Sequence, residues 1–265
     1  MKEELLASLF VIAACGTAMA EMFPIIDVRE GYLVGSIDEG KWIEAKRAVE
    51  SMKVGSTLPI YDLSGQVGKV DVVKVENEGE PCPQTPFVIL DPKQPERGAI
   101  AFAPKWNPLP RKPQTLDVTQ DVYVDLVRKF LIEHKIRDPV VNITQILRID
   151  LDGDGEDEVL ISATHYERES DEVPNGSGAN TYSFVMLRRV VGGKVKTELV
   201  VGEFYPKAKK FNAPNKYEVA ALLDLNGDGK IDIVVHSTYY EGDEIDIFEC
   251  GKSSVKKVLS VGCGA

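Results

Sequence analysis

Two short loops rich in aspartate and glycine carry the residues best suited to chemistry in this 265-residue chain. One runs from Asp150 to Glu158 and the other from Asp224 to Asp232, and each is followed by a run of β-branched residues. In both loops, side chains with carboxylate or amide oxygens stand at positions one, three, five and nine, with glycines between them. A calcium ion needs several hard oxygen donors around one small volume. The sequence therefore predicts two calcium sites in β-hairpin loops.

Two alternatives to such calcium loops fit part of the pattern. An EF-hand needs a bidentate glutamate at position twelve and a helix on each side, whereas position twelve is Ile161 or Val235 here and the flanks are β-branched. A hairpin turn without metal is the other alternative, since Asp and Gly are common turn residues. The acids of the first loop would then repel one another. That objection is weaker for the second loop, where Asn226 replaces an acid and Lys230 lies beside it.

The segments around the two loops form an internal repeat. Gln145–Asp150 aligns with Val219–Asp224, and Val159–Glu167 aligns with Ile233–Glu241. These β-branched segments predict strands, and each copy continues into two further apolar segments joined by a turn with glycine. The further segments are Tyr182–Arg189 and Val195–Val201 in the first copy, and Ile245–Glu249 and Val255–Val261 in the second. Each repeat is expected to fold as a four-stranded antiparallel meander whose first hairpin carries the metal loop.

Between about residues 142 and 261 the chain resembles the FG-GAP and VCBS types of calcium-loop repeat, which occur in integrin-like β-propeller blades and in secreted bacterial proteins. The resemblance implies side-chain ligands at loop positions one, three, five and nine and a carbonyl ligand at position seven. The implied ligands are Asp150, Asp152, Asp154, the Glu156 carbonyl and Glu158 in the first site, and Asp224, Asn226, Asp228, the Lys230 carbonyl and Asp232 in the second. A propeller has roughly four to eight blades, and the sequence holds two convincing copies. Two packed meander sheets, or a propeller fragment completed by other β structure, are therefore expected.

The part of the chain before the repeats is expected to be mostly β. Residues 21–106 show short apolar runs broken by turn residues, which predicts a small N-terminal β domain. Apolar residues at helical spacing predict one short helix between Asp38 and Met52. Asp62–Val73 reads as an ordinary hairpin, with a degenerate third metal loop as the alternative. The whole chain is thus predicted to be mainly β with a few helices.

A proline-rich linker and one clear helix are expected before the first repeat. Residues 107–117 include prolines that remove backbone donors and restrict the preceding residues, which predicts a linker. Within residues 118–265, one apolar face predicts a helix over Thr119–Lys135, with Thr119 and Asp121 available as caps.

The N-terminal residues indicate export. An apolar segment over Leu5–Ala14 leads to Ala18-Met19-Ala20, which resembles a signal-peptidase site, so residues 1–20 are predicted to be a signal peptide. Processing as a lipoprotein with lipid on Cys15 is one alternative, and a buried N-terminal helix is another. The segment is short for a transmembrane helix, which needs roughly 20 apolar residues. A secreted, periplasmic or cell-envelope location is expected.

Three cysteines follow the predicted signal peptide. In an oxidising compartment Cys250 could pair with Cys263 and close a short loop, and Cys82 with Cys263 is an alternative. Three unpaired thiols are the remaining possibility.

The composition and the absence of known catalytic motifs argue against several classes of function. A formal net charge of −11 and the lack of a basic stripe argue against nucleic-acid binding, and the run Lys207, Lys209 and Lys210 is a local exception. No motif of a hydrolase, phosphate loop or zinc site occurs, and His165 and His236 do not stand at equivalent repeat positions. We therefore expect an exported calcium-binding protein that acts as a binding or adhesion module for an extracellular protein or glycan. An envelope hydrolase with structural calcium and an accessory subunit of an envelope complex are the alternatives.

Overall fold

The chain folds into three antiparallel sheets and two α-helices within residues 21–77, 79–93, 99–166 and 174–264, which the computed structural model describes. The prediction of a mainly β chain with few helices is confirmed. The predicted signal peptide lies outside the described residues. Within them, no helix is both long enough and apolar enough to cross a membrane.

The N-terminal sheet has seven strands in the order β3-β2-β1-β7-β4-β5-β6. Its strands are β1 (Phe23–Asp27), β2 (Leu33–Asp38), β3 (Lys41–Glu44), β4 (Thr57–Asp62), β5 (Gly65–Asn77), β6 (Pro86–Asp91) and β7 (Ile100–Ala101). The β4–β5 hairpin pairs Asp62 with Gly65, which confirms the predicted hairpin at this place.

Each repeat supplies four strands to one of the other two sheets, and residues 114–115 of the predicted linker add a fifth strand to the edge of the outer one. The outer sheet has the order β12-β11-β10-β9-β8, and the middle sheet has the order β13-β14-β15-β16. The outer strands are β8 (Gln114–Thr115), β9 (Ile143–Ile149), β10 (Glu158–His165), β11 (Thr181–Val191) and β12 (Lys194–Tyr205). The middle strands are β13 (Lys216–Leu223), β14 (Asp232–Tyr239), β15 (Gly242–Cys250) and β16 (Val255–Gly264).

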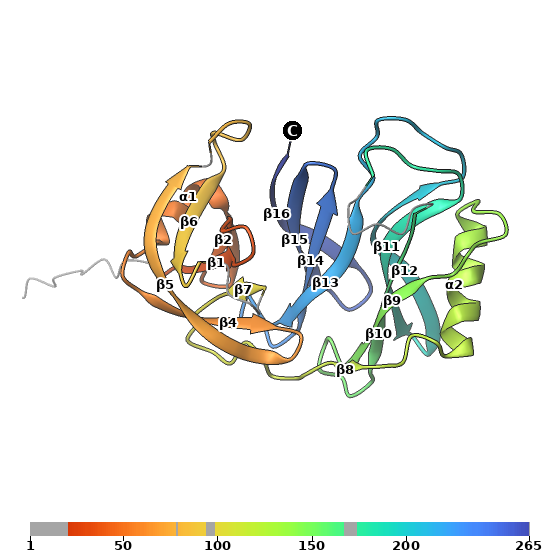
Figure 1. Cartoon of the computed structure of the whole chain (residues 1–265). Helices are drawn as coiled ribbons and strands as arrows, with labels where there is room; N and C mark the ends of the chain where they lie inside the picture. Colours follow the sequence, from red (N-terminus) through yellow and green to blue (C-terminus); the bar gives the residue numbers. More distant parts are fainter. Residues whose placement is uncertain (1–20, 78, 94–98, 167–173, 265) are drawn as a thin grey trace, which may run out of the picture.

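The sheets stand side by side, with the last one in the sequence between the other two (Figure 1). Apolar side chains from the N-terminal and middle sheets, including Ile25, Ile100 and Val234, form one core. The other face of the middle sheet packs on the outer sheet through residues such as Val235 and Leu160. Both faces of β13 and β14 are therefore largely buried, which explains the apolar runs in their sequences.

The two helices differ in detail from the sequence prediction. Helix α1 (Ala45–Ala48) and a 3₁₀ turn over Val49–Ser51 fill only the second half of the predicted helix, because residues 41–44 pair with β2 as an edge strand. Helix α2 (Asp121–Glu133) covers the free face of the outer sheet with Val127, Phe130 and Leu131. Its N-cap is Gln120, with no side-chain cap, because Thr119 donates its hydrogen bonds to Asp117.

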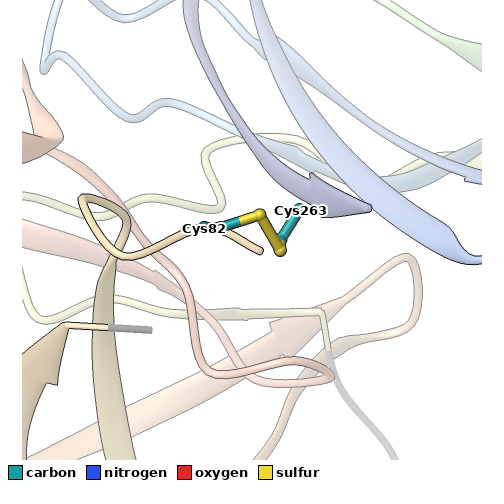
Figure 2. The surroundings of a disulfide bond; sticks show 2 residues. All are labelled: Cys82 and Cys263. Carbon is teal, nitrogen blue, oxygen red and sulfur yellow. A yellow bond between two sulfur atoms is a disulfide. The ribbon is translucent and has the colours of Figure 1, made fainter. Parts of the chain in front are cut away.

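A disulfide joins Cys82 to Cys263, with the two Cα atoms 5.8 Å apart (Figure 2). Of the pairings left open by the sequence, Cys250 with Cys263 is therefore wrong. The physical reason is the register of β15 and β16, which pairs Cys250 with Val255 and Cys263 with Asp243, so these cysteines stand at opposite ends of one hairpin. Cys250 is a buried free thiol whose pKa is raised by burial. The disulfide ties the segment before β6 to the middle sheet.

Candidate metal centre

Each aspartate-rich loop connects two neighbouring antiparallel strands. The first loop runs from the end of β9 to Glu158, the first residue of β10, and the second runs from the end of β13 to Asp232, the first residue of β14. The four loop glycines all have positive φ, between 77° and 91°. Side chains with a Cβ rarely adopt this conformation, which accounts for glycine at these positions.

Hydrogen bonds fold the first loop around its own carboxylates. The two oxygens of Asp150 accept from the amides of Gly153 (2.6 Å) and Gly155 (3.1 Å), and Glu158 accepts from the amide of Leu151 (2.7 Å). Asp152 accepts from the amide two residues on (3.2 Å). The loop therefore curls so that its first and last carboxylates turn toward the same interior.

The second loop makes the same hydrogen bonds at equivalent positions. Asp224 accepts from the amides of Gly227 (2.8 Å) and Gly229 (3.0 Å), and Asp232 accepts from the amide of Leu225 (3.0 Å). The equivalence follows from the repeat in the sequence.

Three carboxylates of the first loop come together. The ligand atoms of Asp150, Asp152 and Glu158 all lie within 4.8 Å of one another, and Glu158 is buried. Burial raises the pKa of Glu158, the hydrogen bond from Leu151 lowers it, and the neighbouring loop carboxylates raise it again. Asp154 is exposed and lies outside this group, and its side chain accepts from the amide of Glu156 (2.8 Å). A divalent cation could be held by the three gathered carboxylates.

The second loop differs because its groups have other polar partners. Asp228 pairs with the ammonium group of Lys230 (2.7 Å), and the amide nitrogen of Asn226 donates to Glu249 (3.1 Å). Burial raises the pKa of Asp232 well above its ordinary value. Within the described residues, the acids of this loop do not form a gathered group like that of the first.

Glu249 is a site neighbour that sequence reasoning missed. It lies on β15, one residue beyond the pair Ile233 and Phe248, which places it opposite the start of β14. At the corresponding place beside the first loop, next to the pair Val159 and Arg188, stands Arg189. The two loops therefore share a backbone conformation while their neighbours carry opposite charges. Only the strand register could have identified these residues.

The two loops are also bound to each other through the segment expected to be a linker. Arg111 donates from Nε to the carbonyl of Asp150 (2.5 Å) and from Nη2 to those of Leu151 (3.2 Å) and Gly229 (2.8 Å). The amide of Ile231 donates directly to the Leu151 carbonyl (2.8 Å).

Trp106 and Pro108 anchor the same segment to the second loop. The Trp106 indole donates to the carbonyl of Asp224 (2.9 Å), and the amide of Asp224 donates to Pro108 (2.9 Å). The segment between the N-terminal and outer sheets therefore helps to position both aspartate-rich loops.

Gly227 and Gly155 provide a matched pair for testing this packing. Both have positive φ, but a Cβ on Gly227 would lie 3.1 Å from the Trp106 ring, whereas one on Gly155 would meet nothing within 4 Å. We expect Gly155→Ala to lower the free energy of unfolding by about 1 kcal/mol, from backbone strain alone. Gly227→Ala should lower the free energy of unfolding by about 2 to 3 kcal/mol, because overpacking against Trp106 adds to the backbone strain. Urea unfolding in EDTA measures both, and equal losses would contradict the proposed contact with Trp106.

The histidines take structural positions away from the carboxylate group. His236 is buried between the middle and N-terminal sheets, with Nδ1 3.0 Å from Arg29 and Nε2 3.6 Å from Asp243. Burial and the Arg29 charge lower its pKa. His134 stacks on Phe204 with ring centroids 4.1 Å apart. Within the described residues, the gathered group of candidate metal ligands contains no histidine.

Comparisons of the chain with protein-family models, with curated proteins and with solved structures found no match.

Proposed function

We propose that this chain binds two calcium ions, one in each aspartate-rich loop, and that the ions rigidify an exported binding or adhesion module. The observation that carries the proposal is the convergence of Asp150, Asp152 and Glu158, whose ligand atoms lie within 4.8 Å of one another. The repeated hydrogen bonds of the second loop extend the proposal to Asp224–Asp232. As part of this proposal, both loops are of the FG-GAP or VCBS type.

The electrostatics of the first loop favour a cation. Gathered carboxylates repel one another, and partial burial disfavours their charged forms. The nearby arginines have other partners: Arg111 donates to carbonyl oxygens, Arg148 pairs with Asp157 at 2.8 Å, and Arg189 pairs with Glu198. A bound divalent ion would remove the repulsion and would couple metal binding to folding. Calcium fits better than magnesium, because a flexible set of carboxylate and carbonyl oxygens suits its variable coordination.

The proposed cellular location and the proposed class of binding partner are inferred from the sequence. The proposed export signal comprises residues 1–20, and extracellular calcium is abundant enough to fill sites with a Kd of about 10⁻⁴ to 10⁻³ M. An extracellular protein or a glycan is the proposed partner of the rigidified module.

A calcium titration of the thermal midpoint tests the proposal, with magnesium as the control ion. At free calcium 100 times Kd, each site should stabilise the fold by about 2.7 kcal/mol, and calorimetry should count two ions per chain. Asp152→Asn should weaken calcium binding by at least roughly tenfold, because it removes one ligand charge, and should leave stability in EDTA nearly unchanged.

Asp157→Asn is the matched control for this experiment. It lies in the same loop and loses the same charge, but its partner is Arg148, so the calcium titration should stay as in the native protein. A midpoint that does not respond to calcium, or responds equally to magnesium, would refute the calcium proposal. Equal effects of both substitutions would refute the assigned ligand set.

A further inference from the structure

A basic loop with an exposed aromatic residue stands out on this acidic protein. It joins β12 to β13, and its residues 206–211, which we call the basic tip, are all exposed. The tip carries Lys207, Lys209 and Lys210, and Phe211 is 84% exposed. Within the described part of the chain, none of the three lysines forms an ion pair. Positive charge and a large apolar side chain are therefore presented together to solvent.

The tip is held in one shape by the neighbouring segment. Ser177 and Lys209 exchange two backbone hydrogen bonds of 2.9 Å each, and the Asn212 side chain accepts from the amide (3.0 Å) and hydroxyl (3.2 Å) of Ser177. The ammonium group of Lys209 lies 5.5 Å from the centre of the Tyr205 ring. These contacts flank Phe211 on both sides and fix the backbone that presents it to solvent.

The backbone at Phe211 is itself unusual. Its φ is +52°, a region that residues with large side chains rarely adopt because the Cβ approaches the backbone. Strained backbone persists where surrounding contacts enforce it, and such residues concentrate at functional positions. Here the contacts of Ser177 and Asn212 supply that constraint, and the outcome is an aromatic ring facing water.

The direction of the strands places the tip far from the calcium loops. β12 ends at Tyr205 where β11 begins, and the first calcium loop lies at the opposite end of β9 and β10. Figure 1 shows the loop between β12 and β13 at the far end of the sheets from the loop that joins β9 and β10. The tip can therefore meet a flat surface while the acidic loops point away from it.

We propose that the basic tip binds an anionic lipid surface, with its lysines among the phosphate headgroups and Phe211 inserted at the boundary of the acyl chains. Lysines near such a surface strengthen binding roughly fivefold each, and aromatic rings are favoured at the interface between water and hydrocarbon. The net charge of −11 opposes approach of the protein as a whole, but ions screen charges separated by more than about 8 Å at physiological ionic strength. The positive charge of the tip then determines which part of the protein faces the lipid surface.

Sedimentation with phosphatidylglycerol vesicles, and with phosphatidylcholine vesicles as the uncharged control, tests this proposal in the full chain. We expect binding to the anionic vesicles only. The triple substitution Lys207→Gln, Lys209→Gln and Lys210→Gln should weaken binding roughly 100-fold, by the same fivefold per lysine. Phe211→Ser should weaken it roughly tenfold or more, because a buried aromatic side chain is lost.

A second triple substitution supplies the matched control. Lys194, Lys252 and Lys256 are exposed near the turns β11–β12 and β15–β16, and their change to glutamine alters the net charge equally without touching the tip. This variant should bind like the native protein, and all results should hold in EDTA and in calcium. Equal losses in both triple variants, unchanged binding of the tip variants, or equal binding to phosphatidylcholine would each overturn the proposal. Circular dichroism of each variant checks that the fold is retained.

Discussion

Cys82→Ser is expected to lower the free energy of unfolding by about 5 kcal/mol, the largest effect of any single substitution considered for this protein. The bond to Cys263 closes a loop over a sequence separation of 181 residues. In the chain-entropy model, such a cross-link removes many conformations from the unfolded state, and the effect grows with the logarithm of loop length. The native contacts around Cys263 need not change for this loss to occur.

Chemical unfolding with and without a reductant measures this effect. Reduction of the native protein should reproduce the loss seen in Cys82→Ser, and the reductant should have no further effect on that variant. Cys250→Ala is the control, because Cys250 is a buried free thiol and its removal should leave the sensitivity to reductant unchanged. An unfolding midpoint of the native protein that is the same with and without reductant would contradict the prediction.

Arg111→Ala is expected to lower the free energy of unfolding by about 3 kcal/mol, since hydrogen bonds from a charged donor each contribute about 1.5 to 3 kcal/mol when buried and less when partly exposed. The substitution removes three hydrogen bonds and leaves the carbonyl of Leu151 with only its bond from Ile231. Because the guanidinium group joins both aspartate-rich loops, the calcium affinity of both proposed sites should fall together.

Arg148→Ala is the matched control for Arg111. Arg148 also lies beside the first loop, but it forms a half-exposed ion pair with Asp157, and such pairs contribute about 0 to 1 kcal/mol. Urea unfolding in EDTA separates the direct effect on the fold from the effect on metal binding. Equal losses from the two substitutions would show that Arg111 is an ordinary surface cation.

The sequence predicted the local features that depend on short spacing. The two hairpin loops, the β4–β5 hairpin and helix α2 each depend on neighbouring residues, whose types favour one backbone conformation. The prediction of a helix between Asp38 and Met52 was wrong in its first half, where the residue types allow two conformations. Trp42 and Ile43 suit a strand as well as a helix, and pairing with β2 decides between them.

Features that depend on distant parts of the chain could not be predicted. The partner of Cys263 follows from how the N-terminal and middle sheets pack. Arg111 lay in the predicted linker and Trp106 at the end of the predicted N-terminal domain, and their contacts with the loops arise only when both loops fold against the same segment. Strand register places Glu249 and Arg189 opposite the first residues of β14 and β10. Pattern alone did not show that the second repeat would pack between the other two sheets.

The position of the middle sheet has a consequence for biosynthesis. Its strands, β13 to β16, leave the ribosome after the strands of both sheets that they separate. Domains usually begin to fold from the N-terminal side during synthesis, but here the two earlier sheets each keep an apolar face without its native cover until residues 216–264 arrive. A nascent chain that stalls before that point would expose two apolar surfaces at once. Binding of chaperones to the nascent chain should therefore be greatest late in translation.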